Sequence, residues 1–153
     1  MEEKQILLYI DLDGVIADFE EGVRKLMPSM IWDQESVDRI CEANPHVFET
    51  LPEIDGGIEA VKLLAEYYEI YFLSTPMCNV PESYMGKRKW LHEKFGAWCE
   101  KRLILTHRKD LNKGEFLIDD RIKNGVENFD GHHIHFGTEL FPDWDSVLNF
   151  LIK

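Results

Sequence analysis

The sequence predicts an α/β protein whose core is a doubly wound parallel sheet. Short apolar runs alternate with helical patterns along the chain, and each run is continuous rather than alternating and ends at a polar residue. Continuous apolar runs are typical of strands buried on both faces, and strands that alternate with helices favour parallel βαβ units. At 153 residues the chain has the size of one ordinary domain with a small insertion.

The apolar runs give the expected strands. The clearest strands are 6–10, 70–73 and 116–118, and weaker candidates lie at 103–105 and 134–136. Helical patterns separate them: one begins after Asp55, one ends at Gly96, and the last follows Asp143. Glycine at the end of a helix and aspartate at the start of one are common boundary signals.

Residues 20–54 do not follow this rhythm. They have helical patterns without a strand, and Pro28, Pro45 and Pro52 interrupt them. We interpret this segment as a small helical cap inserted just after the first strand, so that the core comprises residues 1–19 and 55–153.

Charge and cysteine content limit the partners. The formal charge of -12, from 17 basic and 29 acidic residues, argues against a long nucleic acid or an anionic membrane as the main partner, because both would be repelled. A small anion could still bind where a metal ion or a few cations reverse the local charge.

Three widely spaced cysteines, Cys41, Cys78 and Cys99, indicate neither a disulfide framework nor a structural zinc site. The N-terminal segment resembles neither a signal peptide nor a membrane span, so we expect a cytoplasmic protein.

Polar residues follow three of the expected strands. They are Asp11 and Asp13 after the first, Ser74 and Thr75 after the second, and Asp119 and Asp120 after the third. In an open parallel sheet the ligand crevice lies beyond the carboxyl ends of the strands, so these side chains should meet there. Residues at i and i+2 of an extended chain share a face, which directs Asp11 and Asp13 into one crevice, and Gly14 allows a sharp turn behind them.

Four carboxylates in one crevice require a counter-charge. Two unit charges about 4 Å apart repel by about 4 kcal/mol at an effective dielectric constant of about 20. A divalent cation would balance them, and oxygen ligands favour Mg²⁺ where a phosphate completes the shell. A carboxylate nucleophile, a metal and a second carboxyl group are the parts needed for phosphoryl transfer. A lone Asp-x-Asp is often only a turn or a cap, but together with the other two strand ends it favours a functional site.

At these residues the chain resembles the haloacid dehalogenase (HAD) superfamily of phosphatases, whose core is a Rossmann-like sheet. Its four signatures occur in order: Asp11-Leu-Asp13-Gly, Leu73-Ser74-Thr75, a lysine ahead of the last strand, and Leu117-Ile118-Asp119-Asp120. Within the superfamily the chain is most similar to the 5'(3')-deoxyribonucleotidases. The segments that carry this similarity are DLDGVIADF, NPHVFETLPEIDGGIEAVKLL, FLSTP, KRKWLHEKFG, LILTHRKD and FLIDDR.

The resemblance implies a role for each signature residue. Asp11 would be the nucleophile, and Asp13 would protonate the leaving sugar oxygen and then activate water. The Ser74 hydroxyl and the Thr75 amide would hold the phosphoryl group. Lys109, which lies ten residues before Asp119 as the family spacing requires, would supply the positive charge. Lys113 is the alternative for that role.

The resemblance also implies a magnesium site. Its ligands would be one oxygen of Asp11, the backbone carbonyl of Asp13 and one carboxylate of the Asp119-Asp120 pair. We choose Asp120 as the direct ligand and place Asp119 behind it, where it would orient the site.

Three aromatic residues are candidates for substrate contact. Phe19 lies where the family places a ring against the substrate, and Trp32 and Phe48 of the cap could stack on a base. Core packing in a small cap is the alternative for all three. The chain departs from the family in a shorter cap segment than the animal members have, and in Cys78, which stands where those members carry a lysine for the phosphate.

Several other signals are given structural interpretations. His132, His133 and His135 are expected in the last strand rather than in a zinc site. The cluster of Lys87, Arg88 and Lys89 is expected to be a solvated basic face, with a substrate contact as the alternative. Cys78 is expected to fill space rather than to act as a nucleophile, because no base is near it in the sequence. His107 is expected in a surface loop, with a contact to the phosphate as the alternative.

The resulting hypothesis is a Mg²⁺-dependent phosphomonoesterase that forms an aspartyl-phosphate and acts on nucleoside monophosphates, most simply a 5'(3')-deoxyribonucleotidase. The alternatives are a phosphatase of a small non-nucleotide phosphomonoester and a phosphate-binding module without turnover. A module of that kind would most simply lack Asp13 or Lys109, and both residues are present. A homodimer is left open.

Overall fold

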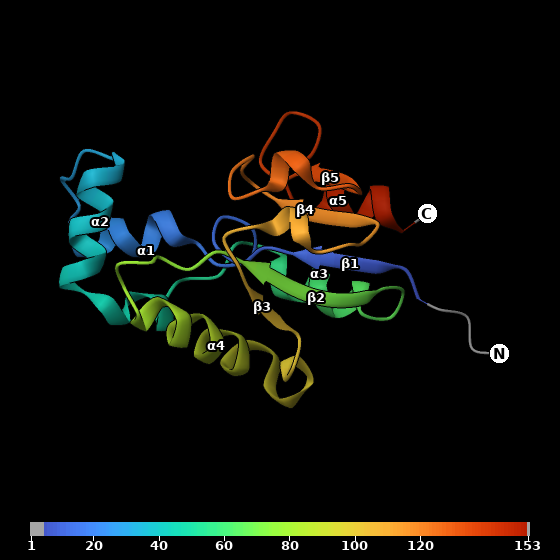
Figure 1. Cartoon of the computed structure of the whole chain (residues 1–153), viewed down its shortest axis with the longest axis horizontal. Helices are drawn as coiled ribbons and strands as arrows, with labels where there is room; N and C mark the ends of the chain where they lie inside the picture. Colours follow the sequence, from blue (N-terminus) through green and yellow to red (C-terminus); the bar gives the residue numbers. More distant parts are fainter. Residues whose placement is uncertain (1–4, 153) are drawn as a thin grey trace.

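The computed structural model describes residues 5–152, in which five strands form one parallel sheet in the order β3-β2-β1-β4-β5. The strands are β1 (Leu7–Ile10), β2 (Glu69–Ser74), β3 (Leu103–Leu105), β4 (Phe116–Asp119) and β5 (His132–His135). The predicted doubly wound parallel sheet is confirmed, including its two weaker strands (Figure 1).

The helices occupy the segments between the strands. They are α1 (Phe19–Leu26), α2 (Gln34–Ala43), α3 (Gly57–Leu64), α4 (Glu82–Phe95) and α5 (Trp144–Leu151), with short 3-10 helices η1 (Pro45–Glu49), η2 (Gly96–Cys99), η3 (Lys109–Leu111) and η4 (Val126–Asn128). Asp18, Asp33 and Asp143 each accept a backbone N–H at the start of α1, α2 and α5. These caps satisfy donors that the first turn of a helix leaves without partners.

The central strand β1 brings the functional strand ends together. Leu8 of β1 pairs with Ile70 of β2 on one side and with Phe116 of β4 on the other. Beyond the strand, the Asp11 N–H donates to the Ile118 carbonyl at 2.9 Å, which continues the ladder into the loop. Because all pairs are parallel, the carboxyl ends of the strands lie along one edge of the sheet.

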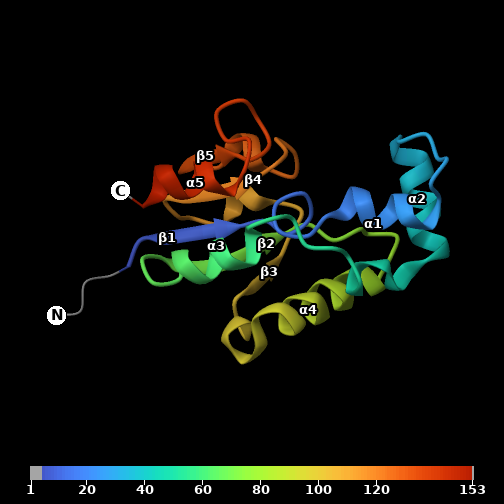
Figure 2. The same ribbon diagram turned by 180° about the vertical axis from the view of Figure 1, so that it is seen from behind.

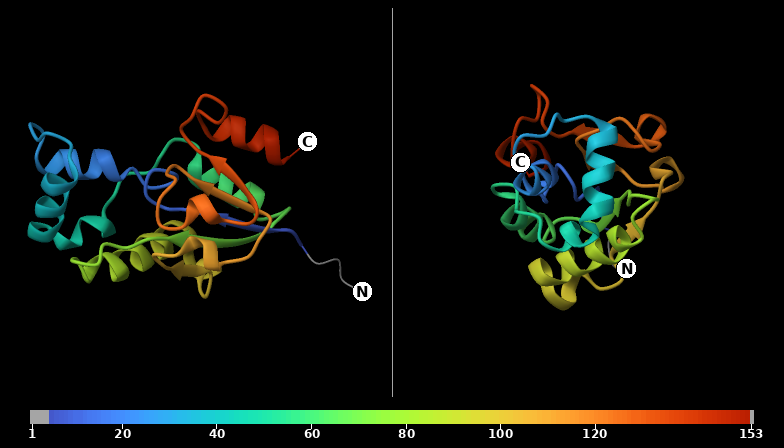
Figure 3. Two further views of the ribbon diagram at one scale, coloured as in Figure 1. Left: turned by 45° about the horizontal axis from the view of Figure 1, so that its top comes forward. Right: turned by 90° about the vertical axis from the view of Figure 1, so that its left-hand side faces the viewer.

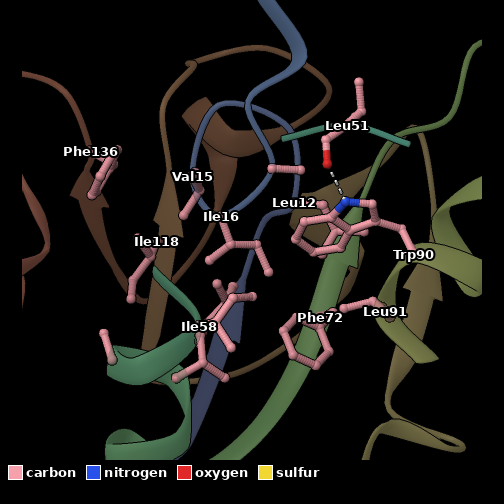
Figure 4. Close-up of a cluster of buried hydrophobic side chains, with 14 of the residues drawn as sticks. Leu12, Val15, Ile16, Leu51, Ile58, Phe72, Trp90, Leu91, Ile118 and Phe136 are labelled. Atoms are coloured by element: carbon pink, nitrogen blue, oxygen red, sulfur yellow. Dashed lines mark hydrogen bonds between the residues drawn. The ribbon is translucent and has the colours of Figure 1, made fainter. Parts of the chain in front are cut away.

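The two faces of the sheet are covered differently. Alternate strand residues such as Ile10, Phe72 and Ile118 face a large core to which α3, α4 and α5 contribute. Figure 4 shows Phe72 and Ile118 in this cluster. On the opposite face, strand residues that include Tyr9, Leu73 and Leu117 pack on Val126 and Phe129, which lie in and next to η4. Continuous apolar strands follow from this arrangement, since both faces are buried.

Helices α1 and α2 lie beyond the carboxyl edge of the sheet, toward which β1 and β2 point (Figures 1 and 2). The views of Figure 3 show α2 at the same end of the molecule. Helix α4 reaches this group from the core: a Cβ added at Gly86 would lie 2.7 Å from the Cβ of Phe48 in η1. Residues 20–54 are thus helical as expected, whereas their separation as a cap domain stays a prediction.

Two buried tryptophans of the core bond to the chain on either side of α1 and α2. The indole N–H of Trp90 donates to the Leu51 carbonyl at 2.8 Å, and that of Trp144 donates to the Val15 carbonyl at 2.8 Å (Figure 4 shows the first bond). Each bond satisfies a carbonyl, that of Val15 before residues 20–54 and that of Leu51 near their end. None of the helices within residues 5–152 has the length and apolar character that crossing a bilayer requires.

We predict that Trp90→Phe lowers the free energy of unfolding by about 2–3 kcal/mol, because it leaves the Leu51 carbonyl without its donor and opens a small void. Trp98→Phe is the control, since Trp98 is 36% exposed, and it should cost less than about 1 kcal/mol. Chemical denaturation measures both. Equal losses in the two variants would contradict the anchoring role of Trp90.

Candidate active site

Three carboxylates converge at the carboxyl edge of the sheet. Asp11 follows β1, Asp119 ends β4 and Asp120 follows it, and one oxygen of each lies within 4.8 Å of the others. Asp11 is 6% exposed and Asp119 is 1% exposed. Carboxylate oxygens at this spacing, on two buried residues and one partly buried residue, form a group that could hold a hard divalent cation.

A buried lysine neutralises part of this charge. Lys109 is 3% exposed, and its Nζ lies 3.2 Å from Asp11 Oδ1 and also donates to Asp119 Oδ2. Burial alone would lower the pKa of Lys109, but the charges of Asp11 and Asp119 raise it above its ordinary value, so the ammonium stays protonated. Lys113, the alternative, has a side chain that is 70% exposed and pairs with Asp130.

Asp119 and Asp120 differ in their remaining oxygens. Asp119 accepts from Lys109 through one oxygen and from the Arg121 N–H through the other, at 2.9 Å. Asp120 Oδ1 is buried and has no hydrogen-bond partner within residues 5–152. Burial, together with the charge of Asp11, raises the pKa of both carboxyls to about 7. An unpaired buried oxygen is costly unless a ligand completes it.

The turn behind Asp13 fits closely around Asp120. Gly14 has φ +83°, and a Cβ added there would overlap Asp120 Oδ2 and lie 2.6 Å from its Cγ. The N–H groups of Ile16 and Ala17 both donate to the Leu12 carbonyl, at 2.9 and 3.0 Å, which makes the turn compact. Gly14 is therefore required both for its conformation and for this close approach.

The hydroxyl groups of Ser74 and Thr75 differ in their hydrogen bonding. Ser74 is 1% exposed, and its hydroxyl has no partner in the described part of the chain. The Thr75 hydroxyl donates to the Thr106 carbonyl at 2.8 Å. The Ser74 hydroxyl is thus the side-chain group of this pair that remains available to a ligand.

Asp13 has a partner that the sequence did not predict. Its Oδ2 accepts from Lys87 Nζ at 2.7 Å, and the Asp13 side chain stays 24% exposed. The expectation of a solvated basic face is wrong for Lys87, which is 2% exposed. The missed signal was helical spacing, because Lys87 lies three residues before the buried Trp90 and therefore on the same face of α4.

The three candidate aromatic rings form one group. The rings of Phe19 and Phe48 stack with centroids 5.6 Å apart, and Trp32 meets Phe19 edge-on at 6.1 Å. Phe48 is 1% exposed, Phe19 is half-buried and Trp32 is 37% exposed. The Arg24 guanidinium lies 5.0 Å from the Trp32 ring centroid.

The histidine cluster lies in β5, as expected, and holds the acidic loop. His133 Nε2 donates to the Asp119 carbonyl at 2.9 Å, and His135 Nε2 donates to the Asp120 carbonyl at 3.0 Å. Burial lowers the pKa of His133, which favours its neutral form with the proton on Nε2. These contacts fix the backbone of the Asp119-Asp120 pair from the neighbouring strand.

Cys78 does not fill space in the core. It is exposed, and its Sγ lies 3.1 Å from His107 Nε2, which also donates to the Pro76 carbonyl at 3.0 Å. The sequence did not indicate this contact, because Cys78 and His107 are 29 residues apart in the chain. His107 is exposed, as expected of a surface loop.

Comparison with known proteins identifies the family. A family model described as "5' nucleotidase, deoxy (Pyrimidine), cytosolic type C protein" matches residues 33–141, which is more than half of the chain. The chain belongs to the 5'(3')-deoxyribonucleotidase family. A protein of Vibrio phage KVP40 that is assigned to this family is 41% identical over 95% of this chain and 84% of its own length. Membership makes the chain a phosphoric monoester hydrolase of the HAD superfamily.

More distant members and a solved structure agree. The 5'(3')-deoxyribonucleotidase of Bacillus subtilis is 28% identical over 85% of this chain and 84% of its own length. The human cytosolic type is 25% identical over 95% of this chain and 80% of its own length. A Bacillus subtilis protein assigned as a HAD-hydrolase, solved bound to magnesium, matches with a TM-score of 0.69 over 97% of this chain and 99% of its own, at 9% identity. This last likeness concerns the fold.

We predict that Gly14→Ala weakens Mg²⁺ binding by at least about tenfold, because the added methyl group displaces Asp120. Gly137→Ala is a matched control: Gly137 has φ +86° with no atom within 4 Å of an added Cβ. Both variants should lose about 1 kcal/mol of stability from the positive φ, and only Gly14→Ala should lose Mg²⁺ affinity. Calorimetric titration with MgCl₂ measures the Mg²⁺ affinity of each variant. Equal affinities in the two variants would contradict the prediction that Asp120 is a metal ligand.

Proposed function

We propose that this protein is a Mg²⁺-dependent phosphomonoesterase that removes the phosphate from nucleoside monophosphates, deoxynucleotides foremost, through an aspartyl-phosphate on Asp11. The observation that supports this most strongly is a set of buried polar groups at the carboxyl edge that lack a hydrogen-bond partner. The Ser74 hydroxyl and Asp120 Oδ1 are both buried without a partner in the described residues, and Lys109 adds a buried positive charge. A phosphate and a metal ion would complete these groups together.

In the first step, a carboxylate oxygen of Asp11 attacks the phosphorus atom, and the bond from phosphorus to the sugar oxygen breaks. The electron pair of that bond stays on the sugar oxygen, which takes the proton of Asp13 and leaves as a nucleoside hydroxyl. The Lys109 ammonium and the Ser74 hydroxyl hold the phosphoryl oxygens during the transfer. The partial exposure of Asp13 supports this role, since the leaving group must reach it.

In the second step, a water molecule attacks the phosphorus atom of the aspartyl-phosphate and gives a proton to Asp13. The bond between phosphorus and the Asp11 oxygen breaks, which releases inorganic phosphate and restores the Asp11 carboxylate. Asp13 ends protonated, as it began, so the cycle is balanced.

The donor set fits Mg²⁺. Asp11, the backbone carbonyl of Asp13 and Asp120 would be its ligands, and Asp119, whose two oxygens already accept hydrogen bonds, would orient the site from behind. When bound, Mg²⁺ supplies positive charge that offsets the repulsion between the phosphate and the carboxylates.

We propose that Phe19 and Trp32 contact the nucleoside and that Phe48, which is 1% exposed, backs the Phe19 ring. The names of the relatives support a nucleoside monophosphate as the substrate. The charge of -12 weighs against a nucleic acid end or an anionic membrane. A cytoplasmic location is in line with the human relative, which is described as cytosolic.

We predict Mg²⁺-dependent phosphate release from a panel of 5' and 3' deoxynucleotides, ribonucleotides and sugar phosphates, concentrated on the deoxynucleotides and abolished by EDTA. Asp11→Asn should lower kcat by at least about 1,000-fold. Asp130→Asn is the control, because Asp130 is 72% exposed and pairs with Lys113, and it should stay within about twofold of wild type. Phosphate release confined to sugar phosphates would reject nucleotides as the substrate. No release from any substrate would favour a phosphate-binding module without turnover.

A further inference from the structure

We propose that Lys87 is a positioning residue that holds the Asp13 carboxyl group in place for proton transfer to the leaving group. This inference rests on the proposed function and adds a residue outside the four signatures. It is carried by the juxtaposition of a buried ammonium, the Asp13 carboxylate and the Phe48 ring.

Lys87 is buried in an unusual way. Of the lysines that the structure describes, Lys87 and Lys109 are the two that are buried, at 2% and 3% exposed. Burial of an ammonium is unfavourable unless the charge is paired and hydrogen-bonded. The ion pair of Lys87 is with Asp13, and its Nζ also lies 5.6 Å from the centroid of the Phe48 ring.

The geometry leaves Asp13 able to act. Lys87 donates to Oδ2 at 2.7 Å, whereas Oδ1 accepts no hydrogen bond from residues 5–152. The ion pair represents the ionised form of Asp13, which Lys87 holds through Oδ2. Oδ1 stays available to take up the proton that Asp13 then gives to the leaving group. A carboxylate that is 24% exposed and lies on a turn would otherwise sample several rotamers.

Lys87 also connects this group to the cap segment. It lies on α4 next to Gly86, whose close approach to Phe48 sets the packing of α4 against η1. Phe48 in turn stacks on Phe19, a proposed substrate contact. A side chain held between Phe48 and Asp13 thus has a fixed position relative to both the substrate and the acid.

The experiment compares two esters with different needs for protonation. A nucleoside monophosphate releases an alkoxide, which must be protonated as it leaves, whereas p-nitrophenyl phosphate releases a stable phenolate that needs no proton. The quantity measured is kcat/KM, because it covers the steps up to departure of the leaving group. A loss of fold or of phosphate binding would lower both values together.

Lys87→Met should lower kcat/KM for deoxynucleoside 5'-monophosphates by about 100-fold and that for p-nitrophenyl phosphate by less than about fivefold. Lys94→Met is the matched control. Lys94 lies two turns further along α4, pairs with Glu53 at 3.3 Å and has its Nζ 5.5 Å from the Trp90 ring centroid. It should leave both values within about twofold of wild type.

Equal losses on the two esters, or no loss on either, would overturn the proposal. Lys87→Gln, which keeps a donor without the charge, is measured beside Lys87→Met, and thermal melting is recorded for both. Unfolding of both variants below the assay temperature would overturn a positioning role in favour of a structural one. Wild type and Asp11→Asn run in parallel, so that failure of the proposed function appears as a wild type inactive on both esters or an active Asp11→Asn.

Discussion

Repulsion among the carboxylates at the carboxyl edge of the sheet determines which charged side chains are buried around them. Three of them lie within 4.8 Å of one another and are largely buried, where each pair repels by several kcal/mol. Lys109 offsets part of this charge, and Lys87 pairs with the fourth carboxylate, Asp13. What remains is a net negative site with an unpaired oxygen on Asp120, which is the electrostatic condition for binding a divalent cation.

The fold brings these carboxylates together and also holds them in fixed positions. Parallel pairing along β1 delivers the strand ends to one edge, and the hydrogen bonds from His133 and His135 hold the backbone that carries two of the carboxylates. Gly14 brings the first loop against Asp120. The site is therefore assembled from rigid strands and a compact turn, so that its geometry is set before any ligand binds.

The sequence predicted the strand ends well because two independent patterns coincide there. Continuous apolar runs mark buried strands, and the polar residues directly behind them must lie at the ligand edge of a parallel sheet. The sequence did not predict the burial of Lys87, because three adjacent basic residues are typical of a solvated face and the packing of α4 against η1 is a long-range contact. The bonds from His133 and His135 were missed for a related reason: they depend on the register of β5 against β4, which local sequence does not specify.

In the proposed mechanism, Asp11 becomes covalently phosphorylated during turnover. The most direct measurement is a single turnover with a deoxynucleoside 5'-monophosphate and Mg²⁺, quenched in acid within milliseconds and followed by mass spectrometry of the peptide that contains Asp11. We expect a phosphoryl group on Asp11 that forms and decays at rates consistent with kcat. Phosphate release at the full rate with no phosphorylated peptide at any time, or with the phosphoryl group on another residue, would contradict a covalent mechanism through Asp11.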